Sequence, residues 1–106
     1  MTEITLVVKQ SCETCTLIEP IIRQIAEHFN LRVICQDTQD FQAGLPVEFD
    51  ASLEQSYRLR IEVVPTLIIQ KDGIETSRIF GWDVAAWEAL LSIQFKSDLP
   101  KFRPGC

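Results

Sequence analysis

The chain has 106 residues, of which 46% are hydrophobic and 24% charged, and its mean hydropathy is +0.08. This length and composition fit one soluble globular domain with its own core and exclude a disordered chain. The net charge of -5 argues against binding of nucleic acid, which needs a basic face, and gives no attraction to an anionic membrane surface. We therefore expect no nucleic acid and no membrane among its partners.

The start of the chain indicates its compartment. Glu3 stands where a signal peptide carries positive charge, and no apolar run reaches the length of a membrane span. We therefore expect a cytoplasmic protein. Four cysteines in that compartment favour redox chemistry or metal binding over a disulfide framework.

The first third of the chain predicts a βαβ unit. Residues 4–8 (ITLVV) and 31–35 (LRVIC) are short apolar runs rich in β-branched residues, typical of buried parallel strands. Between them, isoleucines and Phe29 recur at steps of three and four, which predicts a helix. Pro20 falls inside that helical pattern, so we expect it to kink the helix.

The remaining two thirds predict an acidic excursion, a helix, a hairpin and a last helix. Residues 37–50 mix acids with apolar residues and fit a loop or a partly folded excursion, after which Ser52–Gln55 (SLEQ) matches a capping box that opens a helix through Leu59. Two strands joined by Asp72-Gly73 predict a hairpin. Gly81 ends the second strand, and Asp83 caps a helix with four residues inward: Val84, Trp87, Leu90 and Leu91.

This order, βαβ, helix and then ββα, predicts an α/β fold with a central mixed sheet flanked by helices. We assign residues 1–96 to this domain. Residues 97–106 contain two prolines and a glycine, so we expect an extended tail or a truncated linker there.

The cysteines at 12 and 15 carry the chemistry that the sequence predicts. Two residues separate them at a strand-to-helix junction, where the unpaired N–H groups of the first turn favour a thiolate. We expect Cys12 to attack a disulfide and Cys15 to resolve the mixed disulfide that forms. No organic cofactor or metal is needed for this exchange.

Several spacings together resemble the thioredoxin superfamily. Pro20 lies five residues after Cys15, as the helix-kinking proline of that family does, and Val64-Pro65-Thr66 resembles the family's cis-proline loop. The resemblance implies a thioredoxin-like fold and a thiol–disulfide oxidoreductase that acts on protein or small-molecule disulfides and draws on a thiol reductase or thiol donor. It also implies that Val64, Pro65 and Thr66 shape the substrate groove, with Val64 pairing to an extended substrate strand.

The sequence departs from that family around the first cysteine. Ser11 replaces the usual tryptophan, and Leu6 stands where the family often has a buried aspartate. Thr14 and Glu13 separate the two cysteines, and the negative charge of Glu13 opposes a thiolate at Cys12, with Lys9 offsetting part of it. A less stable thiolate means a more reducing couple, so we predict that the protein is a reductant.

The other two cysteines and the tryptophans are ambiguous. Cys35, in a predicted central strand, is typical of core filling, and Cys106 in the Pro-Gly tail is better explained as an idle end than as a thiol that reaches the dithiol. Trp87 fits the core. Trp82 fits the core and the substrate groove equally well.

Two other classes of protein remain open. A strand leading into C-x-x-C and a helix is also found in metal-binding modules for copper or zinc, although a closed zinc site needs four ligands and the sequence has no second such pair. A non-catalytic interaction domain of the same fold is the third possibility.

Overall fold

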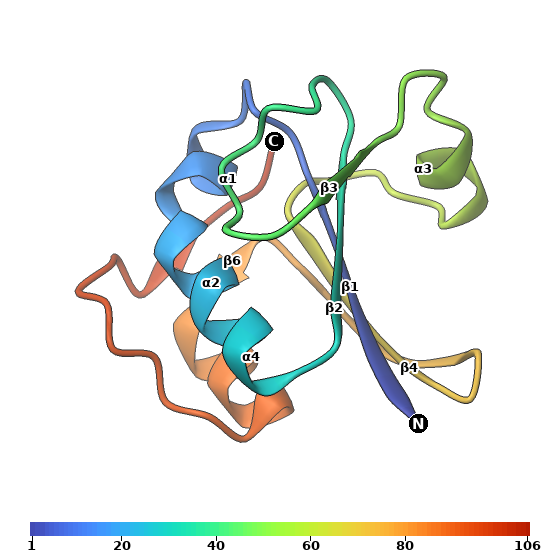
Figure 1. Ribbon diagram of the computed structural model, residues 1–106. Coiled ribbons are helices and arrows are strands. Elements are labelled where there is room, and N and C mark those ends of the chain that lie inside the picture. The colour runs from blue at the N-terminus through green and yellow to red at the C-terminus, as the bar shows by residue number, and fades with distance from the viewer.

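The computed structural model describes all 106 residues (Figure 1). In chain order the elements are β1 (Thr2–Val8), α1 (Glu13–Leu17), α2 (Glu19–His28), β2 (Leu31–Cys35), β3 (Val47–Phe49), α3 (Glu54–Arg58), β4 (Thr66–Lys71), β5 (Ile74–Phe80), β6 (Trp82–Asp83), α4 (Val84–Leu91) and β7 (Phe102–Arg103). The larger sheet has five strands in the order β3-β2-β1-β4-β5, and the smaller one pairs β6 with β7. None of the helices combines the length and apolar character needed to cross a membrane.

The predicted βαβ unit is confirmed, and it holds the centre of the sheet. β1 pairs in parallel with β2 from Ile4 opposite Leu31 to Val8 opposite Cys35. On its other side β1 pairs antiparallel with β4, and β4 pairs antiparallel with β5. The predicted mixed α/β sheet flanked by helices is therefore correct.

The first helix is divided rather than kinked at its proline. α1 ends at Leu17 and α2 begins at Glu19, with Ile18 between them. Pro20 lies in the first turn of α2, where its missing N–H leaves no hydrogen bond unmade. The prediction of an interior kink at Pro20 was therefore wrong in position, because the helical pattern continues across both helices and conceals the break.

The short helix α3 begins differently from the predicted capping box. Its N-cap is Leu53, in the left-handed region with φ 60°, and no side chain of that residue caps it. Instead the buried carboxylate of Asp50 accepts hydrogen bonds from the backbone N–H of Gln55 and from the N–H and hydroxyl of Ser56. The excursion before it is mostly loop and contributes β3, which pairs in parallel with β2.

The predicted hairpin is present as β4 and β5. Asp72 and Gly73, at its turn, both have positive φ (53° and 82°). This is the backbone that a two-residue turn needs when it joins strands of right-handed twist, and it explains the Asp-Gly pair.

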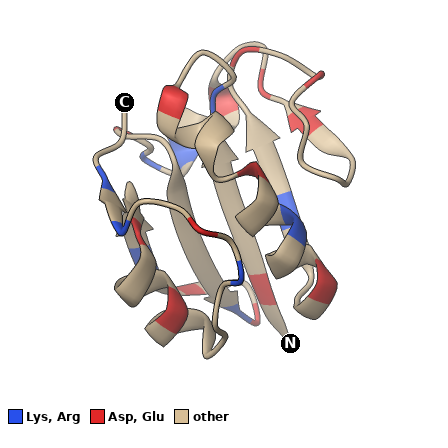
Figure 2. Ribbon diagram, turned by 90° about the vertical axis from the view of Figure 1, so that its left-hand side faces the viewer, with Lys and Arg blue, Asp and Glu red and all other residues tan.

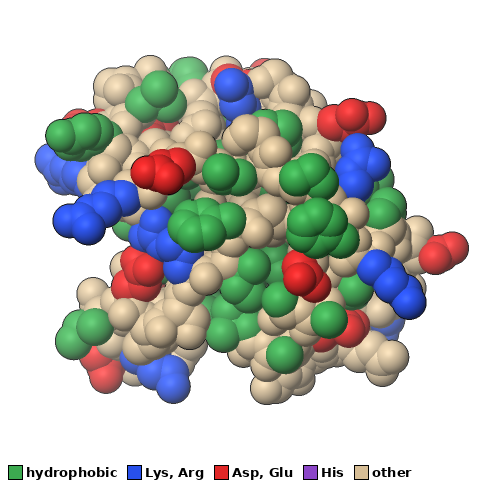
Figure 3. Space-filling model, turned by 180° about the vertical axis from the view of Figure 1, so that it is seen from behind, with side chains coloured by type: hydrophobic (Ala, Val, Ile, Leu, Met, Phe, Trp, Pro, Cys, Tyr) green, Lys and Arg blue, Asp and Glu red, His purple; other side chains and the backbone are tan.

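The two faces of the large sheet are covered differently. One face carries the apolar core under α1, α2 and α4 (Figure 2), with Leu6, Val33 and Leu67 side by side on adjacent strands. Figure 3, which views the molecule from behind, shows hydrophobic side chains in the middle of that side with charged ones around them.

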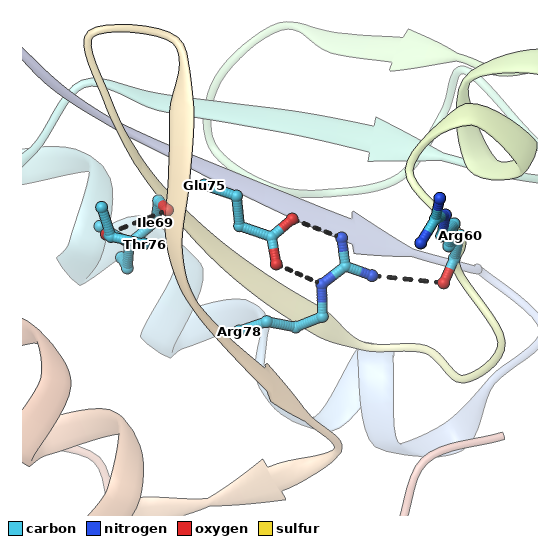
Figure 4. A network of polar contacts seen from close by, with 5 residues as sticks. All are labelled: Arg60, Ile69, Glu75, Thr76 and Arg78. Atoms are coloured by element: carbon cyan, nitrogen blue, oxygen red, sulfur yellow. Dashed lines mark hydrogen bonds and ion pairs between the residues drawn. The ribbon is translucent and has the colours of Figure 1, made fainter.

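Long charged side chains cover part of the other face of the sheet, opposite to the face of Leu6. Arg32 donates hydrogen bonds to Glu48 and Gln55. Arg78 donates to both carboxylate oxygens of Glu75 and to the carbonyl of Arg60 (Figure 4). Arginine stems shield neighbouring apolar groups while their heads stay paired and hydrated.

Residues 97–106 return along the domain. β7 pairs with β6, and the N–H of Val84 donates to the carbonyl of Lys101 at 2.9 Å. The buried indole of Trp82 donates to the carbonyl of Pro100 at 2.7 Å. The end of this segment lies beside the start of α1 (Figure 1). Asp83 caps α4 as predicted, through the N–H of Ala86.

Replacing Asp50 tests its role as the cap of α3. Burial alone raises the pKa of Asp50, but the bonds from Ser56 and Gln55 outweigh it, so the pKa lies below its ordinary 3.8. The stabilisation is therefore present above pH 3.8 and is lost as pH falls through the lower, folded value. We expect Asp50→Asn to reduce the free energy of unfolding by about 1–2 kcal/mol at pH 7. Urea unfolding at pH 7 and pH 3 should show a smaller difference from wild type at pH 3.

The matched control is Asp40→Asn, which removes a carboxylate from an exposed loop position. We expect that variant to unfold within about 0.5 kcal/mol of wild type at both pH values. Equal losses in the two variants would contradict the role assigned to Asp50.

Candidate active site

Cys12 and Cys15 lie at the first turn of α1, immediately after the loop that leaves β1. Cys12 is the N-cap residue, with φ −90° and ψ 118°, and Cys15 is the third residue of the helix. The side chains at these two positions lie close enough to interact across a helix start. The spacing of the motif is thus matched to the geometry of a helix N-terminus, with Cys15 buried inside.

Burial governs the chemistry of Cys15. It raises the pKa of the Cys15 thiol to about 12 from an ordinary 9.0, and the neighbouring Cys35 and Asp37 raise it further. A hydrogen bond from the backbone N–H of Lys9 to Sγ, at 3.4 Å, and the Lys9 charge act in the opposite direction. Cys15 is therefore a protonated thiol at neutral pH.

Asp37 holds the loop in front of Cys12. Its carboxylate accepts the backbone N–H groups of Gln10 at 2.7 Å and Ser11 at 3.1 Å, and the thiol of Cys35 donates to it at 3.2 Å. Burial raises the pKa of Asp37, but these bonds outweigh it and the pKa lies below its ordinary value. Sequence reasoning missed this residue, although parallel pairing of β1 and β2 already places the residues after both strands together.

The Val64-Pro65-Thr66 loop meets Cys12 from the opposite side. The Val64–Pro65 peptide bond is cis, and all three loop residues are buried. The Sγ atom of Cys12 lies 3.7 Å from the carbonyl oxygen of Val64, although 52 positions separate them. The structure thus brings the cysteine pair and the predicted proline loop to one place.

Cys12 is joined by a disulfide to Cys106, and Cys15 and Cys35 are buried free thiols. The interpretation of Cys106 as an idle end is therefore wrong. Its backbone N–H donates to the carbonyl of Val64 at 2.8 Å, and its carbonyl accepts the Val64 N–H at 3.3 Å. Composition could not show this pairing, because 94 positions separate the two cysteines and the segment between 97 and 106 has no periodicity.

The other predicted site residues lie around this disulfide. Glu13 is exposed and lies 3.7 Å from the guanidinium of Arg103, whereas Thr14 is buried and its hydroxyl donates to the carbonyl of Pro104 at 2.9 Å. Trp82 packs edge-on against Trp87, at 5.0 Å between ring centres, in the core below residues 97–106. Pro20 lies farther along, on the exposed side of α2.

The pocket at this site is distinct from the largest pocket of the protein. A pocket of about 200 Å³ opens beside Cys106, between Lys9 and the residues that precede Pro65. The largest pocket, of about 550 Å³, lies between α2 and Leu45 and has no cysteine in its lining. No group of three or more metal-ligating side chains meets anywhere in the chain.

Comparison with solved structures confirms the fold at low sequence identity. StoA from Bacillus subtilis superposes with a TM-score of 0.67 at 14% identity, over 88% of this chain and 83% of that one. Thioredoxin O2 from Arabidopsis thaliana gives 0.61 at 19% identity, over 87% and 73%. A secreted disulfide oxidoreductase of Mycobacterium tuberculosis gives 0.59 at 11% identity, over 74% and 67%. The chain has the thioredoxin-like fold.

Comparison of the sequence alone finds no relatives. No family model matches the chain, and no curated protein matches it. The thioredoxin-like fold that the sequence predicts is therefore confirmed by the arrangement of the sheet and its helices.

The burial of Cys15 makes it unreactive in the form that carries the Cys12–Cys106 disulfide. A pKa of about 12 in place of 9.0 reduces the thiolate fraction about 10³-fold at pH 8, so we expect alkylation by iodoacetamide to be at least that much slower than for a free cysteine. The rate should rise about tenfold per pH unit above pH 8 while the fold persists. Mass spectrometry of timed samples measures it.

The control for this measurement is the same protein in urea. Unfolding removes the burial, so Cys15 and Cys35 should both react at the ordinary rate while Cys12 and Cys106 stay paired. Rapid alkylation of Cys15 in the folded protein would contradict its assignment as a buried, protonated thiol.

Proposed function

We propose that this protein is a thiol–disulfide oxidoreductase in which Cys12 is the attacking thiol and Cys15 the resolving one. The observation that carries the proposal is the geometry at Cys12. Its sulfur stands at the start of α1, 3.7 Å from the carbonyl of Val64, and is bonded to the cysteine of a segment that pairs with Val64. A helix N-terminus facing a strand-pairing edge is suited to exchange with an extended disulfide substrate.

The exchange has two balanced steps. The Cys12 thiolate attacks one sulfur of a substrate disulfide, forming a mixed disulfide while the other substrate sulfur leaves as a thiolate. Cys15 then attacks Sγ of Cys12, which breaks the mixed disulfide, releases the second substrate thiolate and leaves a Cys12–Cys15 disulfide. Because the Cys15 pKa is about 12, its proton must be lost as it attacks, and the departing thiolate gains one.

Three residues of the proline loop supply substrate binding in this proposal. Val64 offers one backbone donor and one acceptor, and Pro65 and Thr66 keep that edge in place beside β4. Trp82 contributes from below, by supporting the surface over which the substrate lies. The partners are a protein or small-molecule disulfide and a thiol reductase or thiol donor, and the redox-active disulfide replaces any cofactor.

We further propose that the protein acts as a reductant, in the cytoplasm that the sequence predicts. Glu13 follows Cys12 directly and opposes a thiolate there, although its exposed side chain can turn toward water. Destabilising the reduced form shifts the couple toward donation of electrons.

Reduction of insulin in the presence of dithiothreitol tests the catalytic assignment. We expect Cys12→Ser to lower the rate at least 100-fold, because the attacking sulfur is lost. Cys15→Ser should accumulate a mixed disulfide with the substrate, visible as a mass adduct. Cys35→Ser, which changes a buried thiol that takes no part in the exchange, is the matched control and should keep most of the activity.

Two results would favour the rival functions. An inactive wild-type protein that binds Zn(II) or Cu(I) tightly through Cys12 and Cys15 would indicate a metal-binding module. An inactive protein without metal affinity would indicate an interaction domain.

The reduction potential tests the direction of electron flow. In the Cys106→Ser background, equilibration with glutathione buffers should give a potential well below that of strongly oxidising dithiol proteins. Glu13→Gln should raise it by at most about 15 mV, because one exposed charge at about 6 Å is well screened. Glu19→Gln, on α2, is the control. A lower potential in Glu13→Gln would contradict the effect assigned to this charge.

A further inference from the structure

Residues 100–106 follow the domain surface to Cys12 through contacts at almost every step. The chain is held at Pro100 by the Trp82 indole, at Lys101 by Val84, and across Phe102 and Arg103 by β6. We call residues 100–106 the docked segment. Its contacts extend from α4 to the cysteine pair, so hydrogen bonds to the domain hold the segment that brings Cys106 to Cys12.

The last residue of the docked segment is bound as a substrate strand is expected to be. Cys106 exchanges two backbone hydrogen bonds with Val64, and its sulfur is bonded to Cys12. We propose that Cys106 is a third redox cysteine, and that the docked segment is an intramolecular disulfide substrate of Cys12 and Cys15. This inference rests on the proposed function and adds the substrate.

Gly105 makes the close approach possible. A Cβ atom at this position would lie 2.1 Å from Cγ1 of Val63 and 2.5 Å from the carbonyl oxygen of Val64, far inside contact distance. Backbone conformation does not require glycine here, since its φ lies outside the left-handed region. Glycine is therefore required at position 105 by lack of space for a side chain, and not by its backbone conformation.

Both residues between the two cysteines contact the docked segment. The Thr14 hydroxyl donates to the carbonyl of Pro104, two positions before Cys106, and Glu13 lies against the guanidinium of Arg103. The middle of the C-x-x-C motif thus binds the backbone and one charge of this segment. These contacts assign to Thr14 and Glu13 a role in substrate selection.

The chemistry regenerates the Cys106 thiol. When Cys106 is oxidised as a mixed disulfide with a low-molecular-weight thiol, the Cys12 thiolate attacks Cys106 Sγ and releases that thiol, forming the Cys12–Cys106 bond seen here. Cys15 then loses its proton and attacks Sγ of Cys12. Cys106 leaves as a thiolate and takes up a proton, and the oxidation now resides in the Cys12–Cys15 disulfide.

The test measures how strongly docking favours the Cys12–Cys106 bond. In a Cys15→Ser variant of the 106-residue chain, glutathione buffers of increasing oxidised fraction are equilibrated with the protein, quenched in acid and mapped by peptide mass spectrometry. We expect the Cys12–Cys106 disulfide to be the dominant intramolecular product. Adding Gly105→Ala should raise the oxidised glutathione needed for half formation at least tenfold, because the segment can no longer approach Val64.

Two further variants separate docking from general damage. Thr14→Val removes one hydrogen bond at nearly constant volume and should raise the same midpoint about fivefold. Gly73→Ala strains a backbone of positive φ (82°) in the turn after β4, at the opposite end of that strand from Thr66, so it should lower stability and leave the midpoint unchanged. Equal midpoints in Gly105→Ala and its parent, or a Cys106 that pairs only with glutathione, would overturn the proposal.

Cys106→Ser keeps the two proposals separable. It retains Cys12 and Cys15, so insulin reduction by this variant tests the oxidoreductase assignment without the docked cysteine. If Cys106→Ser reduces insulin but Cys15→Ser forms no Cys12–Cys106 bond, the role of Cys106 as a third redox cysteine is overturned and the oxidoreductase assignment stands. In wild-type protein, samples quenched in acid during the exchange should show the Cys12–Cys106 disulfide before the Cys12–Cys15 disulfide.

Discussion

The antiparallel pairing of β1 with β4 is the constraint on which the site depends. It places Val7 opposite Thr66, so the loop that leaves β1 and the loop that enters β4 meet at the same edge of the sheet. Cys12 belongs to the first loop and Pro65 to the second, and the sulfur of Cys12 consequently lies 3.7 Å from the carbonyl of Val64. A shift of one residue in this register would reverse the faces of β4 and move Leu67 out of the core. Packing of the core and positioning of the site are therefore enforced by the same hydrogen bonds.

Parallel pairing on the other side of β1 adds the second support. β2 ends level with β1, so Asp37 reaches the backbone N–H groups of Gln10 and Ser11 just before Cys12. The same carboxylate and the thiol of Cys35 lie near Cys15 and oppose its ionisation, beyond the effect of burial. The arrangement that holds the loop before Cys12 thus also keeps Cys15 protonated. In the proposed exchange, Cys15 accordingly stays protonated until a mixed disulfide forms at Cys12.

Local pattern predicted much of the fold, because strands, helices and turns here each carry their own signal. Buried runs at 4–8 and 31–35 and the Asp72-Gly73 turn lead directly to the observed sheet. Two local signals were misleading. The apolar stripe continues across the break between the helices at Ile18. Ser52 matches the N-cap of a capping box, but Asp50, which lies outside that motif, accepts the hydrogen bonds of the first turn. Cys12 and Cys15 were predicted from their spacing, and Val64–Thr66 from the resemblance to a known family. Cys106, Asp37 and Gly105 were not, since their roles depend on contacts between distant segments that only the tertiary structure creates.

The docked segment also describes what a partner in trans would have to offer. Its cysteine needs backbone groups free to pair with Val64, a preceding residue without a side chain, and a carbonyl within reach of Thr14. Arg103 adds a positive charge beside Glu13 on a chain whose net charge is -5. While Cys106 occupies Val64, no other strand can use the same backbone donor and acceptor, so an external disulfide and Cys106 compete for one edge. In the proposed exchange, tethering gives Cys106 the advantage of a high effective concentration, and an external substrate would gain access once transfer of the disulfide to Cys15 had released Cys106.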